Sequence, residues 1–247
     1  LNGVLPTGGL NLLIGRSGSG KTTLLQTLAG FFKPLGGEVR FNGGPWNPSG
    51  NVSMAFQNPE NVFFCETVGE ELTYALHQRG IHSRKAIPQG KDWLAKWGLE
   101  PDIFWDKKPF QVSGGEQRRI ALAACTVFQP PVLLFDEPMA GLDSGGTRAF
   151  REILESLAET HIVVIATHDP ESLLRRAAGV LVLHSQERYY WLSPREFLKS
   201  AWRDPAIFPL PDWYCTALDS VKVKDRDDLP WPEAADVARF LRERPRA

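Results

Sequence analysis

The fold of this chain is decided by the stretch Leu10-Asn11-Leu12-Leu13-Ile14-Gly15-Arg16-Ser17-Gly18-Ser19-Gly20-Lys21-Thr22. The residues before Gly15 are mostly apolar and have the length of a buried strand, and the residues from Lys21 to Ala29 have the pattern of a helix. Between strand and helix, residues 15–22 fit the spacing GxxxxGK[ST]. Such an octet in this position predicts a phosphate-binding loop.

The chemistry of the loop follows from its residue types. Glycines allow several backbone N–H groups to turn toward one anion, and the N-terminus of the following helix adds partial positive charge. Lys21 has the length to reach the β- and γ-phosphates of a nucleotide, and the Thr22 hydroxyl is expected to bind Mg²⁺. An ordinary glycine-rich turn is the alternative, but it requires neither the whole octet nor these neighbours.

Outward from the loop, strand patterns and helix patterns alternate. Strands are predicted at 39–41, 52–56, 132–135, 162–166 and 180–183, and helices at 115–125, 146–159 and 170–177. Between residues 66 and 112 the patterns are helical only, at 67–78 and 87–98. These patterns predict an α/β fold, a P-loop core with a mostly parallel sheet and helices on both faces, carrying an inserted helical sub-domain.

The same patterns divide the chain into four predicted parts. Residues 1–65 and 113–194 are the first and second parts of the nucleotide-binding core, residues 66–112 are the helical sub-domain, and residues 195–247 are a C-terminal extension. Several prolines and charges without clear periodicity occupy residues 203–232, and a terminal helix is expected at 232–242. Trp93 and Trp97 are one helical turn apart, and we interpret them as core residues.

Composition excludes several classes of protein. Hydrophobic residues make up 43% and charged residues 23% of the chain, which is typical of a globular protein and not of a disordered one. The net charge of −1 argues against a general electrostatic attraction to nucleic acid or anionic lipid. The three cysteines are widely spaced, which favours a reducing compartment without a zinc site or disulfide framework. No apolar run has the length of a membrane span.

Two carboxylates end the predicted strand at 132–135. Asp136 and Glu137 follow it directly. Beside a phosphate loop, Asp136 is expected to hold Mg²⁺, and Glu137 is expected to orient or deprotonate the attacking water. A strand that simply stops at a polar turn is the alternative, and the loop upstream disfavours it.

The segment Val112-Ser113-Gly114-Gly115-Glu116-Gln117-Arg118-Arg119 lies about 20 residues before the acidic strand. Ser-Gly-Gly before a helix can be a plain N-cap. In this position, however, it resembles the LSGGQ signature of the ATP-binding cassette (ABC) ATPase family. Val112 stands for the Leu and Glu116 for the final Gln, while the three residues that would meet phosphate are intact.

Further matches follow in the order of the family. Gln57 fits the glutamine at the junction with the helical sub-domain, and Ala140-Gly141-Leu142-Asp143 resembles the D-loop. His168 follows the strand at 162–166, where the family keeps a histidine near the γ-phosphate. The resemblance implies ATP and Mg²⁺ as cofactors, catalysis by Glu137, His168 and Gln57, and metal binding by Thr22, Gln57 and Asp136. It implies nucleotide contacts by Gly15, Arg16, Ser17, Gly18, Ser19, Gly20, Lys21, Thr22, Thr23, Ser113, Gly114, Gly115 and Asp143.

One feature of the family has no match. Its members usually carry an aromatic residue that stacks on adenine well upstream of the phosphate loop. None of the 14 residues before Gly15 is aromatic. We therefore expect an N-terminal edge strand to be missing from this sequence.

A finer resemblance lies in Phe56-Gln57-Asn58-Pro59-Glu60-Asn61-Val62-Phe63-Phe64 and the following Glu66-Thr67-Val68-Gly69-Glu70-Glu71. It is similar to the energy-coupling-factor ATPases, the cobalt- and vitamin-importer branch. It implies that ATP hydrolysis drives import of a small solute, a vitamin or a metal ion, through a separate integral membrane subunit. The chain would then lie at the cytoplasmic face of a membrane, paired head to tail with an identical or different second ATPase subunit.

The resemblance also implies a dock for a cytoplasmic helix of the membrane subunit, near residues 57–64. The candidate apolar contacts are Phe63, Phe64, Phe104, Trp105 and Phe110, for which simple core packing is the alternative.

Three other functions stay open. The first is the ATPase of an exporter or of a lipid or lipoprotein extractor. The second is a non-transport ABC ATPase acting on DNA or ribosomes, which the short separation of 92 residues between Lys21 and Ser113 disfavours, because it leaves no room for a long coiled coil. The third is a P-loop kinase or small GTPase, which the Ser-Gly-Gly segment disfavours.

Overall fold

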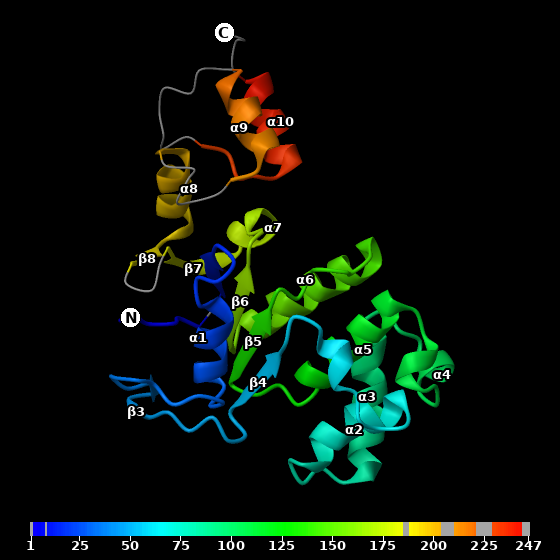
Figure 1. The fold of residues 1–247 in the computed structure, drawn as a ribbon. Coiled ribbons are helices and arrows are strands. Elements are labelled where there is room, and N and C mark those ends of the chain that lie inside the picture. Colours follow the sequence, from blue (N-terminus) through cyan, green and yellow to red (C-terminus); the bar gives the residue numbers. More distant parts are fainter. Residues whose placement is uncertain (1, 8, 185–187, 204–209, 221–228, 244–247) are drawn as a thin grey trace.

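The computed structural model describes residues 2–7, 9–184, 188–203, 210–220 and 229–243. Its centre is a six-stranded sheet in the order β4-β5-β6-β1-β7-β8 (Figure 1). The strands are β1 (Leu10–Gly15), β4 (Val52–Ala55), β5 (Val132–Asp136), β6 (Ile162–Thr167), β7 (Ala177–Leu183) and β8 (Tyr189–Leu192). Neighbouring strands are parallel except β7 and β8, which are antiparallel. The predicted α/β fold is confirmed.

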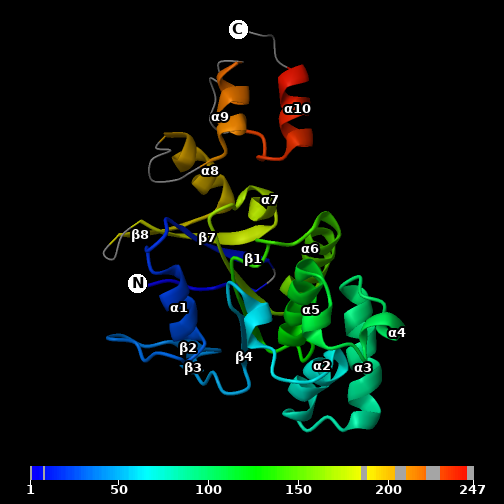
Figure 2. The same ribbon diagram turned by 45° about the vertical axis from the view of Figure 1, so that its right-hand side comes forward.

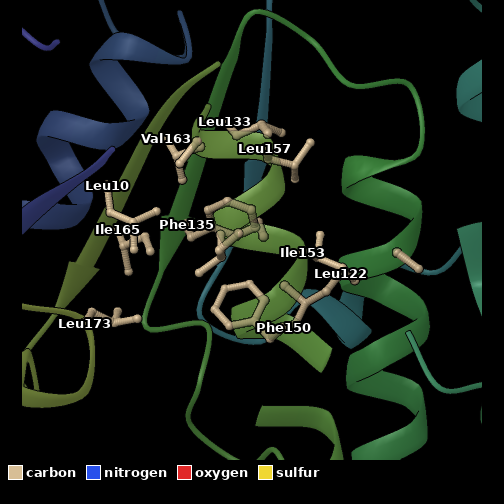
Figure 3. Close-up of a cluster of buried hydrophobic side chains, with 14 of the residues drawn as sticks. Leu10, Leu122, Leu133, Phe135, Phe150, Ile153, Leu157, Val163, Ile165 and Leu173 are labelled. Carbon is tan, nitrogen blue, oxygen red and sulfur yellow. The ribbon is translucent and has the colours of Figure 1, made fainter. Parts of the chain in front are cut away.

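Helices cover both faces of the sheet because side chains alternate along each strand (Figure 2). On one face, Leu13 and Leu134 pack with Leu25 of α1 (Lys21–Leu28), the helix that follows the phosphate loop. On the other face, α5 (Gly114–Thr126) and α6 (Ser144–Ala158) cover a larger core (Figure 3). At its centre the rings of Phe135 and Phe150 meet edge to face, with centroids 5.4 Å apart.

A helical region follows β4, and residues 66–112 contain no strand, as the sequence predicts. Its elements are the 3₁₀ turn η1 (Pro59–Val62), α2 (Val68–His77), α3 (Ser83–Lys96), α4 (Pro101–Phe104) and the 3₁₀ turn η2 (Pro109–Gln111). The predicted start of this helix, residue 87, is later than the observed start of α3. Proline favours the first turn of a helix, but Pro88 lies inside α3. The positions of the boundaries between the four predicted parts stay predictions.

Aromatic side chains form much of the packing in this region. Trp93 and Trp97 are buried, as predicted, and the Trp93 indole N–H donates to Thr126 Oγ1 at 3.0 Å. The ring of Trp105 lies against Gly69 and Gly90, where an added Cβ would come within 2.4 Å and 2.8 Å of it. Phe104 and Trp105, two of the candidate docking residues, are therefore partly buried packing residues.

Short strands were the least accurate part of the sequence interpretation. The predicted strand at 39–41 is β2 (Arg40–Phe41), which pairs with β3 (Gly44–Pro45) in a separate two-stranded sheet. The sequence analysis did not predict β8, an edge strand that pairs antiparallel with β7.

The C-terminal part contains more helix than the sequence indicated. Phe197, Leu198 and Ala201 of α8 (Pro194–Arg203) are buried against the core. Helices α9 (Asp212–Asp219) and α10 (Ala234–Arg242) form a small cluster of their own around Tyr214. The α10 helix agrees with the predicted terminal helix, whereas α8 and α9, of 10 and 8 residues, were not predicted. Residues 204–209 and 221–228 of the aperiodic stretch lie outside the described residues.

Candidate nucleotide-binding and hydrolysis site

The phosphate loop joins β1 to α1 through a backbone that glycine permits. Gly18 and Gly20 have φ angles of 77° and 97°, in the left-handed region that other residues rarely adopt. Inside the loop, Ser19 Oγ is buried and has no hydrogen-bond partner among the described residues. A phosphate oxygen in the loop would supply a partner, so the loop fits the anion that its sequence predicts.

Lys21 is held over its own loop. Its Nζ donates hydrogen bonds to Gly15 O at 2.7 Å and to Arg16 O at 3.3 Å, and the residue is only 9% exposed. Its charge therefore lies beside the N–H groups of the loop and the N-terminus of α1. All three are suited to neutralise a triphosphate.

Two of the three predicted magnesium ligands, Thr22 and Asp136, meet at the carboxyl end of β5. Thr22 Oγ1 donates to Asp136 Oδ2 at 2.7 Å. Gln57 lies just past the end of β4, whose last residue Ala55 is opposite Phe135 of β5. Among the described residues no cluster of three or more His, Cys, Asp or Glu side chains is suited to a metal. A hydroxyl, a carboxylate and an amide fit Mg²⁺, which binds few protein oxygens when phosphate supplies others.

Glu137 and His168 face each other across the ends of β5 and β6. Glu137 Oε2 lies 2.9 Å from His168 Nδ1 and also accepts from the backbone N–H of His168 at 3.4 Å. The side chain of His168 is 73% exposed and that of Glu137 only 13%. Glu137 has a φ of 49°, a strained value for a residue with a side chain. A carboxylate in this position can accept a proton from an attacking water molecule, and the imidazole in contact with it can hold the carboxylate in place.

The signature segment begins α5. Ser113 and Glu116 form a capping box: Ser113 N and Oγ donate to Glu116 Oε2 at 2.8 Å and 2.7 Å, and Glu116 N donates to Ser113 Oγ at 3.4 Å. These hydrogen bonds lower the pKa of Glu116. The carboxylate is thus turned back onto Ser113, and an added Cβ on Gly114 would touch nothing within 4 Å.

Asp143 lies near the signature segment, with its Oδ2 3.9 Å from Arg119 Nη2 on α5. It caps α6 by accepting from Gly146 N at 2.7 Å, and an added Cβ on Gly115 would be 4.0 Å from Gly141 O. Among the described residues, no hydrogen bond or ion pair joins residues 113–115 to residues 15–22 of the same chain. The predicted site residues therefore form two groups, one around the phosphate loop and one around the start of α5.

The structure adds Arg118, a residue for which the sequence analysis had no role. Its side chain is buried, and Nη2 donates to Gln57 O at 2.7 Å and to Glu137 O at 2.9 Å. The sequence could have indicated this residue, because an arginine at a position on the apolar face of a predicted helix is unusual. In α5, Arg118 is buried together with Ile120 and Leu122.

Glu171, at the start of α7 (Glu171–Leu174), adds a titrating group next to the site. Burial, followed by the hydrogen bond and charge of Asp169, raises the pKa of Glu171 to about 7. Because the folded chain then binds this proton more tightly than the unfolded chain, the free energy of unfolding falls as pH rises from about 4.5 to about 7.

A Glu171→Gln variant, which cannot ionise, is therefore expected to be more stable than the wild-type chain at pH 8. After allowance for solvent screening the gain is on the order of 1 kcal/mol, or roughly 2–4 °C in melting temperature. Melting curves at pH 5 and pH 8 check this, with the exposed Glu152→Gln as control. A gain of the same size at both pH values would contradict the assigned cause.

Comparison with known proteins agrees with this geometry. The family model described as ABC transporter matches residues 1–140, and an AAA domain model matches residues 108–174. The energy-coupling factor transporter ATP-binding protein EcfA2 of Thermotoga maritima is 36% identical over 211 residues, which cover 83% of this chain and 77% of that protein. EcfA2 of Lactiplantibacillus plantarum is 34% identical, over 85% and 76% of the two chains.

Solved structures give the same result. The structure of cbiO1 from Clostridium perfringens, described as part of the ABC transporter complex cbiONQ, has a TM-score of 0.70 and 27% identity, over 83% of this chain and 86% of that one. The dimeric bacterial ABC transporter cassette MJ0796 has a TM-score of 0.65 and 26% identity, over 77% and 88% of the two chains.

A mostly parallel sheet with a phosphate loop, an acidic strand end and a signature helix defines a P-loop ATPase. This chain belongs to the ABC transporter ATPase family and hydrolyses ATP. None of the helices in the described part of the chain combines the length and apolar character needed to cross a membrane.

Proposed function

We propose that this chain is the ATP-hydrolysing subunit of a membrane importer, which couples ATP binding and hydrolysis to uptake of a small solute, a vitamin or a metal ion. A separate transmembrane subunit forms the pathway and holds the chain at the cytoplasmic face of the membrane. The observation that carries the proposal is an apolar groove lined by Pro59, which follows Gln57 by two residues. The similarity to EcfA2 proteins and to cbiO1 supports this type of transporter.

The groove has a volume of about 370 Å³ and lies between the loop after β4, α2 and α5. Phe63 and Phe64 form one wall of the groove, and Tyr74 of α2 and Cys125 of α5 also line it. Phe64 is 66% exposed and meets Tyr74 edge to face, with ring centroids 4.6 Å apart. Such an exposed aromatic pair on the rim of an apolar groove suits the apolar face of a helix from another protein.

Polar contacts hold the groove in shape. The buried Glu71 carboxylate accepts from the backbone N–H groups of Phe64 and Cys65, at 2.6 Å and 2.7 Å, and so fixes the wall. At the other end, the Arg79 guanidinium lies 4.5 Å from the centroid of the Phe128 ring and donates to Gly50 O. Phe110, 67% exposed, touches Phe63 from outside the groove.

In the proposed hydrolysis, the phosphate loop and Lys21 bind the triphosphate and orient the γ-phosphate toward β5 and β6. Mg²⁺, held by Thr22, Asp136 and Gln57, would supply positive charge to the phosphate oxygens. Glu137 takes the proton of the attacking water, and His168 holds the Glu137 carboxylate and the γ-phosphate in place. Gln57 precedes Pro59, a residue of the groove, by two positions, and this short segment is proposed to couple the site to the groove.

The active form is proposed to be a head-to-tail dimer with an identical or different ATPase subunit. The separation of the site residues into two groups supports this, because residues 113–115 face outward and a second subunit would complete each site. The similar cassette MJ0796 is itself described as dimeric, which agrees with this arrangement.

The groove is tested with a Phe64→Glu variant. A charge placed in an apolar interface is costly, so recovery of the integral membrane subunit with the tagged chain, from detergent-solubilised membranes, is expected to fall about tenfold or more. Stabilisation by Mg-ATP should persist, because Phe64 is outside the phosphate loop. The control is Ile103→Glu on α4, which is 56% exposed and not part of the groove.

Equal recovery with both variants would contradict docking in the groove. Identification of the recovered membrane subunit, and of the direction in which it transports its solute, decides between the two functions. The alternative to uptake is the ATPase of an exporter or of a lipid or lipoprotein extractor.

A further inference from the structure

The buried side chain of Arg118 joins three segments of the chain. Besides Gln57 O and Glu137 O, which Nη2 binds at 2.7 Å and 2.9 Å, its Nε donates to Pro138 O at 3.3 Å. Its Nη1 lies 3.5 Å from Glu60 Oε2. The side chain is 6% exposed, so these contacts are made almost without water.

The two carbonyl groups that accept from Arg118 Nη2 lie just past the ends of two neighbouring strands. Strands β4 and β5 pair in parallel up to Ala55 and Phe135, and Gln57 and Glu137 are each two residues further on. The backbone ladder has ended there, and Nη2 of Arg118 binds one carbonyl from each segment. One planar guanidinium therefore connects the two segments where the sheet no longer does.

Arg118 also holds Glu137 in its strained conformation. The Glu137 N–H donates to Ala166 O at 2.9 Å on the β6 side, and its carbonyl accepts from Arg118 on the β4 side. A left-handed residue with a side chain persists only where its surroundings hold it. Because both backbone groups are bound, the direction of the Cα–Cβ bond, from which the carboxyl group reaches His168, is fixed as well.

We propose that Arg118 is a positioning residue for ATP hydrolysis, which holds Gln57 and Glu137 at a fixed separation and links both, through Glu60, to the wall of the groove. Glu60 belongs to η1, whose residues Pro59 and Val62 line the groove. The inference rests on the proposed roles of Gln57 and Glu137, and it adds the connection between them.

Arginine is suited to this position for a chemical reason. Its fixed plane carries five N–H donors, which can serve several carbonyl groups in different directions at once, whereas a lysine ammonium cannot span them. Burial lowers the pKa of Arg118 and Glu60 opposes this. The guanidinium nevertheless stays charged at neutral pH, and its hydrogen bonds to carbonyls are charge-assisted.

The test compares Arg118→Lys with Arg119→Lys in the full chain, under single-turnover conditions with Mg-ATP. Arg119 is the control on the same helix, with a side chain 13% exposed that donates to Trp97 O and Gly98 O and touches neither Gln57 nor Glu137. Its Nη2 also lies 3.9 Å from Asp143 Oδ2, an ion pair that a lysine can keep. Arg118→Lys is expected to slow hydrolysis about 10- to 100-fold, because a misplaced reacting group costs that much, with the Kd for ATP within about twofold. Arg119→Lys is expected to lose similar thermal stability with a hydrolysis rate within about twofold.

A second comparison keeps the inference testable if Arg118→Lys does not fold. Glu60→Gln weakens one contact and leaves the three carbonyl bonds, so hydrolysis is expected to slow about two- to tenfold with unchanged ATP affinity. Equal rates for the Arg118 and Arg119 variants, or an unchanged rate for Glu60→Gln when Arg118→Lys does not fold, would overturn the inference. Failure of the proposed catalytic role of Glu137 looks different, because Glu137→Gln itself would then keep its turnover.

Discussion

Replacing Glu137 with glutamine is expected to slow ATP hydrolysis by about 10²-fold or more while leaving ATP binding intact. The amide keeps the size of the carboxylate and can still contact His168, which lies 2.9 Å away. It cannot accept the proton of the attacking water. Since Glu137 lies past the end of β5 and does not belong to the phosphate loop, the affinity for ATP has no reason to change.

Two measurements check this result: the rate of phosphate release in the assembled complex and the shift in melting temperature with Mg-ATP. Glu152→Gln, at an exposed position of α6, serves as the matched change of Glu to Gln. Turnover close to normal in Glu137→Gln would remove Glu137 from the role of base. A lost melting shift would instead indicate damage to the phosphate loop.

Dimers that carry Ser113→Arg and Lys21→Ala on different subunits are expected to keep about half of the normal hydrolysis, and dimers that carry both changes on one subunit are expected to have almost none. In a head-to-tail dimer, residues 113–115 of one subunit complete the site at the phosphate loop of the other. Changes on different subunits then fall in the same site and spare the second one. Changes on the same subunit damage both sites.

Differently tagged subunits allow each mixed dimer to be purified and assayed. Thr67→Arg is the control for loss of a helix cap, because Thr67 and Glu70 form a capping box on α2 like that of Ser113 and Glu116 on α5. The opposite pattern, activity only when both changes share one subunit, would show that each chain completes its own site and would contradict the proposed arrangement.

Residues that are neighbours in sequence were predicted well. The phosphate loop is a local structure, in which positive φ at Gly18 and Gly20 and the start of α1 follow from the order of residue types. Asp136 and Glu137 follow directly on a buried strand, and parallel strands place their carboxyl ends at one edge. The meeting of Thr22 and Asp136 at 2.7 Å is a direct consequence.

The sequence by itself therefore determined the α/β class, the phosphate loop and the residues at the strand ends, because these depend on backbone periodicity and on short motifs. Only the tertiary structure decided which side chains meet across long separations: Arg118 binds the carbonyl of Gln57, 61 residues away. It also decided that Trp105 packs inside the helical region while Phe64 stays exposed on the groove. Composition and spacing are the same for a buried and an exposed aromatic residue, and only the packing of neighbouring segments distinguishes them.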